Sequence, residues 1–118
     1  VNVMKKMIFF LERYLTRTFG LTMAEIEREK VRSSFIVINE KGLHTRPSTE
    51  LVKCAASFKS QVNLIYQNTT VSAKSLLGIL MLAAARGARI KVEAEGEDAE
   101  EAVKSILALA KNKFYIKY

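Results

Sequence analysis

The feature that most constrains the fold is an alternation of short strand-like segments with amphipathic segments over residues 34–118. The strand-like segments are rich in β-branched side chains or alternate in polarity, and they cover residues 35–38, 62–66, 70–73 and 89–94. The segments with apolar side chains at helical spacing cover residues 47–57, 75–82 and 97–110. This order predicts an α+β fold, and 118 residues are enough for one such domain.

Residues 1–33 have a different pattern and are predicted to be an N-terminal extension of the domain at 34–118. Apolar side chains recur at helical spacing up to Phe19, Gly20 interrupts them, and a charged stretch follows. One interpretation is an amphipathic helix that contacts a membrane surface or a partner. The other, which we favour, is a segment that packs loosely on its own domain or is dispensable for function. No signal peptide is expected, because Glu12 interrupts the apolar run.

Charge and cysteine content argue against several classes of function. The net charge is +7, but the charges are spread, with seven basic and four acidic residues in 1–33 and twelve and eight in 34–118. No basic run is interleaved with aromatic side chains, so we expect an acidic protein partner and no nucleic acid. Cys54 is the only cysteine and His44 the only histidine, so we expect no disulfide, no metal site, no cofactor and a reducing cytoplasm.

The segment at 40–50 carries the residues most suited to chemistry. Pro47 favours the first turn of a helix and an extended conformation for Arg46, so a helix is predicted to begin at Pro47. The unpaired amides of that turn and the positive end of the helix dipole attract an anion. Gly42 permits a sharp turn that would place His44 over these amides, and Arg46 supplies a guanidinium suited to phosphate oxygens.

The chemistry that this arrangement favours is phosphorylation of His44. A neutral imidazole nitrogen is a nucleophile, and the resulting N-phosphoryl group would lie against the amides and Arg46. A single histidine in a loop is often incidental, so the residues alone leave an incidental histidine and a phosphohistidine equally open.

The predicted helix at 75–82 begins with Ser75. Its hydroxyl suits the N-cap of the helix, and this ordinary role is the one that the residues favour. A phosphate at the same position would also be held by the helix end and would bring about two negative charges to the surface. Both interpretations stay open at this point.

The same helix is too short to bury every apolar side chain that it carries. We expect the core to receive three of them, Ile79, Met81 and Leu82. The other three are expected to form an exposed docking patch near the histidine, and they are Leu76, Leu77 and Leu80.

Three segments, in order, resemble the HPr family, the histidine-containing phosphocarriers of bacterial phosphotransferase systems. The segment GLHTRP at 42–47 resembles the active-site signature, and AKSLLGILML at 73–82 resembles the regulatory serine region. With AEGEDAEEA at 94–102, the resemblance runs from about Phe35 to about Phe114. It implies an open-faced β-sandwich of order βαββαβα, in which three helices cover one face of a four-stranded antiparallel sheet.

The resemblance also implies a function. His44 would accept a phosphoryl group on Nδ1 from enzyme I, which phosphoenolpyruvate charges, and would pass it to EIIA domains of sugar permeases. Such a protein is a phosphoryl carrier and not a stand-alone enzyme. Arg46 would neutralise the group, with Gly42, Thr45 and Pro47 completing the phosphate site. The docking surface of the family maps onto Thr49, Leu76, Leu77 and Leu80.

The resemblance assigns a regulatory role to Ser75, the position that HPr kinase/phosphorylase modifies in some bacteria. Some family members keep this serine without being regulated through it. An alternative function is a regulatory binding module, either a nitrogen-related paralogue or a form controlled at Ser75. The segments at 80–82 and 90–96 resemble the paralogue, whereas Gly78 resembles the sugar-system carriers, which we favour.

Overall fold

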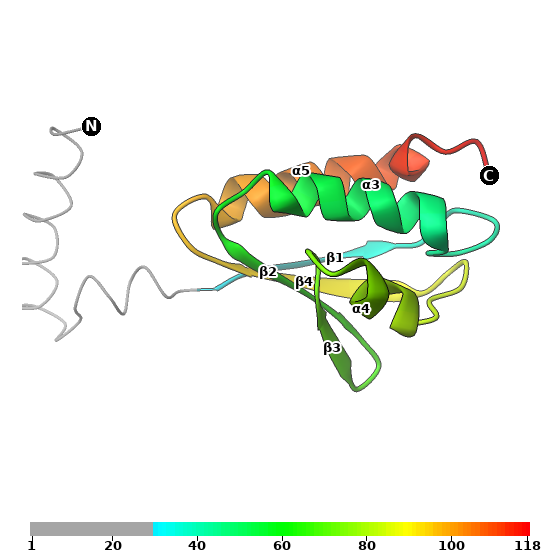
Figure 1. The fold of residues 1–118 in the computed structure, drawn as a ribbon, viewed down its shortest axis with the longest axis horizontal. Helices are drawn as coiled ribbons and strands as arrows, with labels where there is room; N and C mark the ends of the chain where they lie inside the picture. The colour runs from blue at the N-terminus through cyan, green and yellow to red at the C-terminus, as the bar shows by residue number, and fades with distance from the viewer. Residues whose placement is uncertain (1–29) are drawn as a thin grey trace, which may run out of the picture.

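The computed structural model describes residues 30–118, and the predicted helix and membrane contact of the extension lie outside these residues. The described elements follow the predicted order and end in a short 3-10 turn, η1 (Figure 1). They are β1 (Val31–Ile36), α3 (Thr45–Ala56), β2 (Gln61–Tyr66), β3 (Thr69–Ser72), α4 (Leu76–Met81), β4 (Arg89–Glu95), α5 (Ala99–Lys111) and η1 (Lys113–Tyr115).

The four strands form one antiparallel sheet in the order β1-β4-β2-β3. The hairpin between β2 and β3 closes at Tyr66 and Thr69, with Gln67 at a φ of 55° in the turn. Helices α3 and α5 lie side by side over one face of the sheet, and α4 packs beside α3 (Figure 1). The predicted α+β architecture, with three helices on a four-stranded antiparallel sheet, is confirmed.

The buried core lies between the sheet and the helices. Every second side chain of β4 is buried, as its alternating sequence predicts, and the long helix α5 contributes a continuous apolar face. Phe114 of η1 is fully buried and packs edge-on against Phe35, with ring centroids 6.0 Å apart. The turn after the long helix is therefore part of the core.

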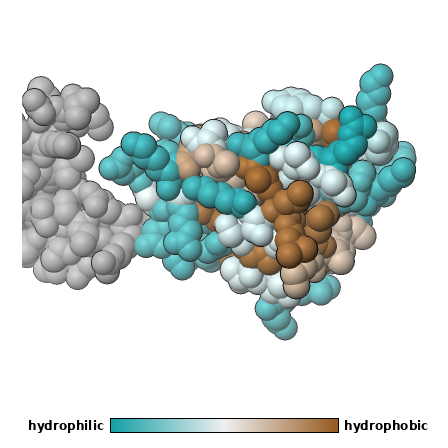
Figure 2. All heavy atoms as spheres, viewed as in Figure 1, coloured by the Kyte–Doolittle hydropathy of each residue, from teal (hydrophilic) through white to brown (hydrophobic). Residues whose placement is uncertain are grey.

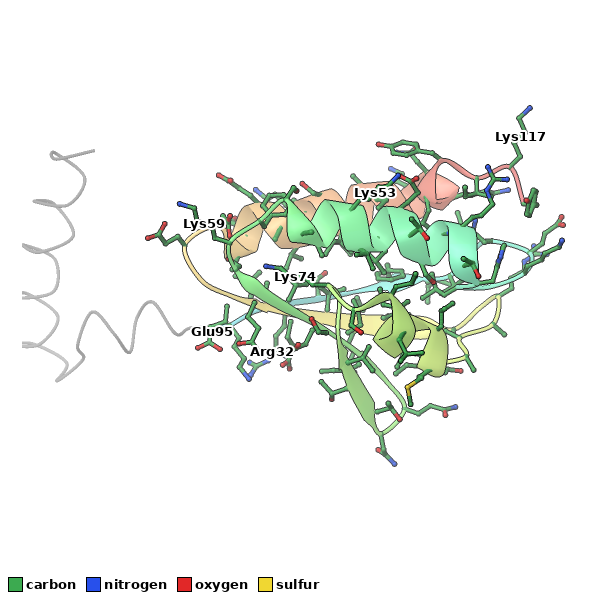
Figure 3. The ribbon with its side chains drawn as sticks, in the orientation of Figure 1. Arg32, Lys53, Lys59, Lys74, Glu95 and Lys117 are labelled. Carbon is green, nitrogen blue, oxygen red and sulfur yellow. The ribbon has the colours of Figure 1, made fainter. Side chains whose placement is uncertain are left out.

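Strand β1 is displaced from its predicted position. The sequence favours residues 35–38, whereas the strand spans Val31–Ile36 and so includes the last residues of the predicted extension. The pattern is weak there because β1 is an edge strand with polar side chains on the open face of the sheet. Arg32 lies on this open face (Figure 3) and pairs with Glu93 of β4, with 3.2 Å between Nε and Oε1.

The start of α5 is tied to the start of β2 by Asp98. Its carboxylate accepts hydrogen bonds from the amides of Lys59 and Ser60, each at 2.9 Å, and from the Ser60 hydroxyl. The Ser60 hydroxyl and the Lys59 amide lower the pKa of Asp98 from 3.8 to about 2. Gly96 permits this contact, because a Cβ on it would lie 2.6 Å from Ser60 Oγ.

The prediction that Met81 lies in the core is wrong. Ile79 and Leu82 are buried, but Met81 is 71% exposed. Ile79 and Leu82 are three residues apart and therefore share one face of α4, whereas a residue two positions from Ile79 lies on the opposite side of the helix. Of the three expected core residues, only Ile79 and Leu82 are therefore buried.

Candidate functional site

Helix α3 begins earlier than predicted. It starts at Thr45, and His44 is its N-cap, with φ −87° and ψ −165°. The amide of Ser48 donates to the carbonyl of His44 at 3.0 Å and closes the first turn. The prediction that Arg46 is extended is therefore wrong, because Arg46 is helical and Pro47 is the third helical residue. Proline at that position loses no intrahelical hydrogen bond. Its preference for an extended conformation of Arg46 is therefore overcome.

Gly42 holds the loop that leads to His44. Its φ is 71°, and its amide donates to the carbonyl of Asn39 at 3.0 Å. The next amide, Leu43 N–H, donates to the carbonyl of Ala84 at 2.9 Å, and a Cβ on Gly42 would lie 2.3 Å from that same oxygen. The sharp turn and close approach predicted for Gly42 are confirmed, and they fix the position of the residue before His44.

The imidazole of His44 is half-buried. Nε2 is buried and has no hydrogen-bond partner within residues 30–118. Because a nucleophile must reach its target, the buried Nε2 is poorly placed to react.

Arg46 and Lys41 surround the site with positive charge. Arg46 Nη1 donates to the hydroxyl of Tyr118 at 3.1 Å, and Lys41 Nζ lies 4.9 Å from the centre of the Tyr118 ring. The ring of Tyr118 in turn stacks against His44, with centroids 6.1 Å apart and 13° between the planes. The first turn of α3 carries no acidic residue, so the helix end and both cations favour an anion here.

The contact with Tyr118 was missed from the sequence. Tyr118 lies beyond the last predicted helix, which ends at residue 110, and it is 72 positions from Arg46. No local pattern predicts such a contact, because it depends on where η1 directs the chain.

Four apolar residues of α4 form a surface that we call the α4 patch: Leu76, Leu77, Leu80 and Met81. Leu77 is 70% exposed, and Figure 2 shows hydrophobic side chains gathered on the surface over α4. Leu80 is half-buried and lines, with His44 and Lys41, a shallow pocket of about 330 Å³. Of the predicted docking residues, Leu80 therefore adjoins the histidine, and Met81 belongs to the same exposed apolar surface.

Thr49 lies one turn along α3 from Thr45 and is half-buried. Its hydroxyl donates to the carbonyl of Thr45 at 2.7 Å. The role of Thr49 in docking stays a prediction.

Ser75 caps α4 as predicted. Its Oγ accepts a hydrogen bond from the amide of Gly78 at 3.0 Å. Gly78 packs closely under this cap, since a Cβ there would lie 3.2 Å from both Ser75 Oγ and Val71 Cβ. The neighbouring Lys74 points away toward α3 and donates to the carbonyl of Phe58 at 2.8 Å (Figure 3).

Residues 30–118 contain no group of three or more His, Cys, Asp or Glu side chains able to hold a metal ion. Among the helices of that same part of the chain, none is long and apolar enough to cross a membrane.

Together, the fold and the site define a small α+β domain that presents a half-buried imidazole beside an arginine at a helix N-terminus. The model of the family described as PTS HPr component phosphorylation site matches residues 31–112. A relative, phosphocarrier protein HPr of Cupriavidus necator, is 42% identical over 78 residues, which are 66% of this chain and 88% of the relative.

Solved structures of HPr proteins show the same fold. The structure from Thermoanaerobacter tengcongensis matches with a TM-score of 0.71 and 36% identity, over 75% of this chain and 99% of that one. The structure from Bacillus anthracis matches with a TM-score of 0.65 and 35% identity, over 67% of this chain and 94% of that one. The chain belongs to the HPr family of phosphocarrier proteins, as its three sequence motifs predict.

Proposed function

We propose that this protein carries a phosphoryl group on Nδ1 of His44, receiving it from phosphorylated enzyme I and passing it to EIIA domains of sugar permeases in the cytoplasm. The observation that supports this most directly is the position of His44 as the N-cap of α3, with Nε2 buried. The family membership supports the same conclusion.

The transfer needs no group beyond those of the two proteins. The lone pair of Nδ1 forms a bond to phosphorus while the bond between phosphorus and the donor breaks, and its electron pair returns to the donor. The proton on Nε2 stays in place. The reverse exchange, with a histidine or cysteine of EIIA as the acceptor, then regenerates free His44.

The site stabilises the transferred group electrostatically. The amides of Thr45 and Arg46 belong to the first turn of α3 and have no partner in the helix, so they are available to phosphate oxygens. The Arg46 guanidinium offsets the charge that develops during transfer. Pro47 contributes rigidity, and Gly42 contributes the loop path described above.

Enzyme I and EIIA would dock on the α4 patch and Thr49. Three of the four patch residues have side chains that are more than one-third exposed, and the fourth, Leu80, reaches the pocket beside His44. An exposed apolar surface next to a reactive group suits a partner that must bring its own reactive group to the same place.

Incubation with enzyme I and phosphoenolpyruvate tests the carrier function. We expect an acid-labile phosphoryl adduct that is absent from His44→Ala and forms roughly 100-fold more slowly in Arg46→Ala. Lys53→Ala is the matched control, since it removes a positive charge from the last turn of the same helix. An adduct that persists in His44→Ala, or no adduct on the unaltered protein, would reject the proposal.

Phosphorylation of Ser75 by HPr kinase/phosphorylase is a second proposal. Its support is the position of Ser75 at the N-cap of α4, directly before Leu76 and Leu77 of the α4 patch. A phosphate there would place negative charge at the docking surface, repel an acidic enzyme I and create a site for other partners. We expect an ATP-dependent, acid-stable phosphate on the unaltered protein that is absent from Ser75→Ala. If the unaltered protein acquires no such phosphate, the proposed regulation at Ser75 is rejected.

A further inference from the structure

Tyr118 contacts three basic side chains of the site at once. Its ring stacks on the imidazole of His44 at 6.1 Å, its hydroxyl accepts from Arg46 at 3.1 Å, and Lys41 Nζ lies 4.9 Å from its ring centre. The ring therefore lies between the loop at 41–44 and the first turn of α3. This arrangement has no role in the function proposed above.

The tail that carries Tyr118 is held in place by buried groups. Asn39 is fully buried, and its Nδ2 donates to the carbonyl of Lys113 at 2.9 Å and to a main-chain oxygen of Tyr118 at 3.1 Å. Between these two points, Phe114 is anchored in the core. Anchors at Asn39 and Phe114 thus fix the path of the tail independently of the Tyr118 side chain.

The backbone of the tail adopts a conformation that needs such anchors. Lys113, Phe114 and Tyr115 have φ values of 54°, 56° and 61°, a left-handed turn that side chains other than glycine disfavour. Because the anchors maintain this turn, Tyr118 is directed to His44 and Arg46 even when no partner is bound.

The hydrogen bond to Arg46 leaves the hydroxyl proton of Tyr118 available. A tyrosine hydroxyl can accept one hydrogen bond and donate another, and Arg46 can only donate. The hydroxyl oxygen therefore accepts the hydrogen bond from Arg46. The hydroxyl proton remains available to donate to an anion that Arg46 also binds.

We propose that Tyr118 is a further phosphate-binding residue, whose hydroxyl donates to an oxygen of the phosphoryl group on His44 while its ring holds the imidazole plane. This inference rests on the proposed phosphorylation of His44. No bond is made or broken at Tyr118, and its effect is to stabilise the phosphorylated form relative to the free form.

The two forms respond differently to loss of the hydroxyl. In the free form, Tyr118→Phe removes a bond between a guanidinium and a neutral oxygen at a solvent-accessible position, where water replaces it. In the phosphorylated form it removes a hydrogen bond to a charged oxygen, which is stronger. We expect the equilibrium constant for phosphoryl transfer from enzyme I to fall roughly tenfold.

The experiment compares four versions of the whole chain: the unaltered protein, Tyr118→Phe, Tyr118→Leu and Tyr115→Phe. Each is equilibrated with enzyme I at fixed ratios of phosphoenolpyruvate to pyruvate, and ³¹P NMR measures the fraction of phosphorylated His44. Tyr118→Phe should lower the transfer constant roughly tenfold and move the ³¹P resonance of the phosphohistidine. Tyr118→Leu, which also lacks the ring, should lower it at least as much. Tyr115→Phe is the matched control, because Tyr115 lies in the same tail and is 75% exposed.

The outcomes separate this inference from the proposed function. An unaltered protein that takes up no phosphoryl group refutes both. Normal phosphorylation with the same transfer constant and ³¹P resonance in Tyr118→Phe overturns only the role of Tyr118. A higher constant in either Tyr118 variant also overturns it, because the side chain would then obstruct the site as a lid.

Discussion

Replacing Gly42 with alanine tests whether the close approach of the loop to Ala84 positions His44. The substitution has two separable costs. The first is the positive φ of 71°, which costs an L-residue roughly 1–2 kcal/mol. The second is a steric overlap, since the new Cβ would lie 2.3 Å from the Ala84 carbonyl oxygen and 2.9 Å from Ala85 Cα.

The overlap cannot be relieved by a side-chain rotation, because both neighbours are backbone atoms. The loop must therefore move away from Ala84 and weaken the hydrogen bond from Leu43 N–H, which contributes about 1 kcal/mol. Adding this to the φ term, we expect Gly42→Ala to lower the free energy of unfolding by roughly 2–3 kcal/mol. His44 moves with the loop, so the rate of phosphoryl transfer should fall by roughly 100-fold.

Gly87→Ala is the matched control for this prediction. Gly87 has a φ of 89°, but no atom lies within 4 Å of the position that an added methyl group would take, so the variant carries the φ cost without the overlap. Urea unfolding of both variants measures the difference, and enzyme I assays measure the transfer rate. Equal destabilisation by the two substitutions, or a normal transfer rate in Gly42→Ala, would show that the approach to Ala84 does not position His44.

Three further predictions concern stability. The folded-state pKa of Asp98, about 2, lies below its ordinary value of 3.8, so the ionised carboxylate stabilises the fold fully above pH 4 and loses this effect as the pH falls toward 2. In urea unfolding, the stability of Asp98→Asn should not show this decrease between pH 4 and pH 2. A variant with the same acid profile as the unaltered protein would contradict the role of Asp98. Phe114→Ala should lower the free energy of unfolding, measured with urea, by roughly 3–5 kcal/mol, and Tyr115→Ala, at an exposed position, should lower it by under about 0.5 kcal/mol. Similar decreases in the two variants would contradict the anchor role of Phe114. Ser75→Ala should cost about 1 kcal/mol through loss of the cap to Gly78, whereas Ser75→Asp should retain most of it, and thermal unfolding distinguishes the two.

The order of elements could be predicted from the sequence because its signals are local. The alternation in Arg89–Glu95 and the helical spacing in Ala99–Lys111 reflect one buried face each, and both elements form as expected. Strand β1 was placed too late because Arg32 and its polar neighbours face solvent at a sheet edge, where no hydrophobic pattern is required.

The site could be predicted only in part for a related reason. Gly42, His44, Arg46 and Pro47 adjoin one another in the chain, so their turn and helix start were accessible to local rules, although those rules placed the helix start two residues too late. The assignment of roles to these residues stays a prediction. Tyr118 was missed because its position depends on a left-handed turn and on the buried Asn39. No local sequence pattern predicts either feature.

The two ends of strand β1 lie at opposite ends of the domain. Val31 pairs with Ala94, close to the corner of Gly96 and Ser60, whereas Ile36 leads toward the loop of His44 (Figure 1). Any polypeptide joined before residue 30 is therefore attached at the pole remote from the imidazole. Residue 30 is therefore a position at which the domain can be labelled or tethered through the end remote from His44.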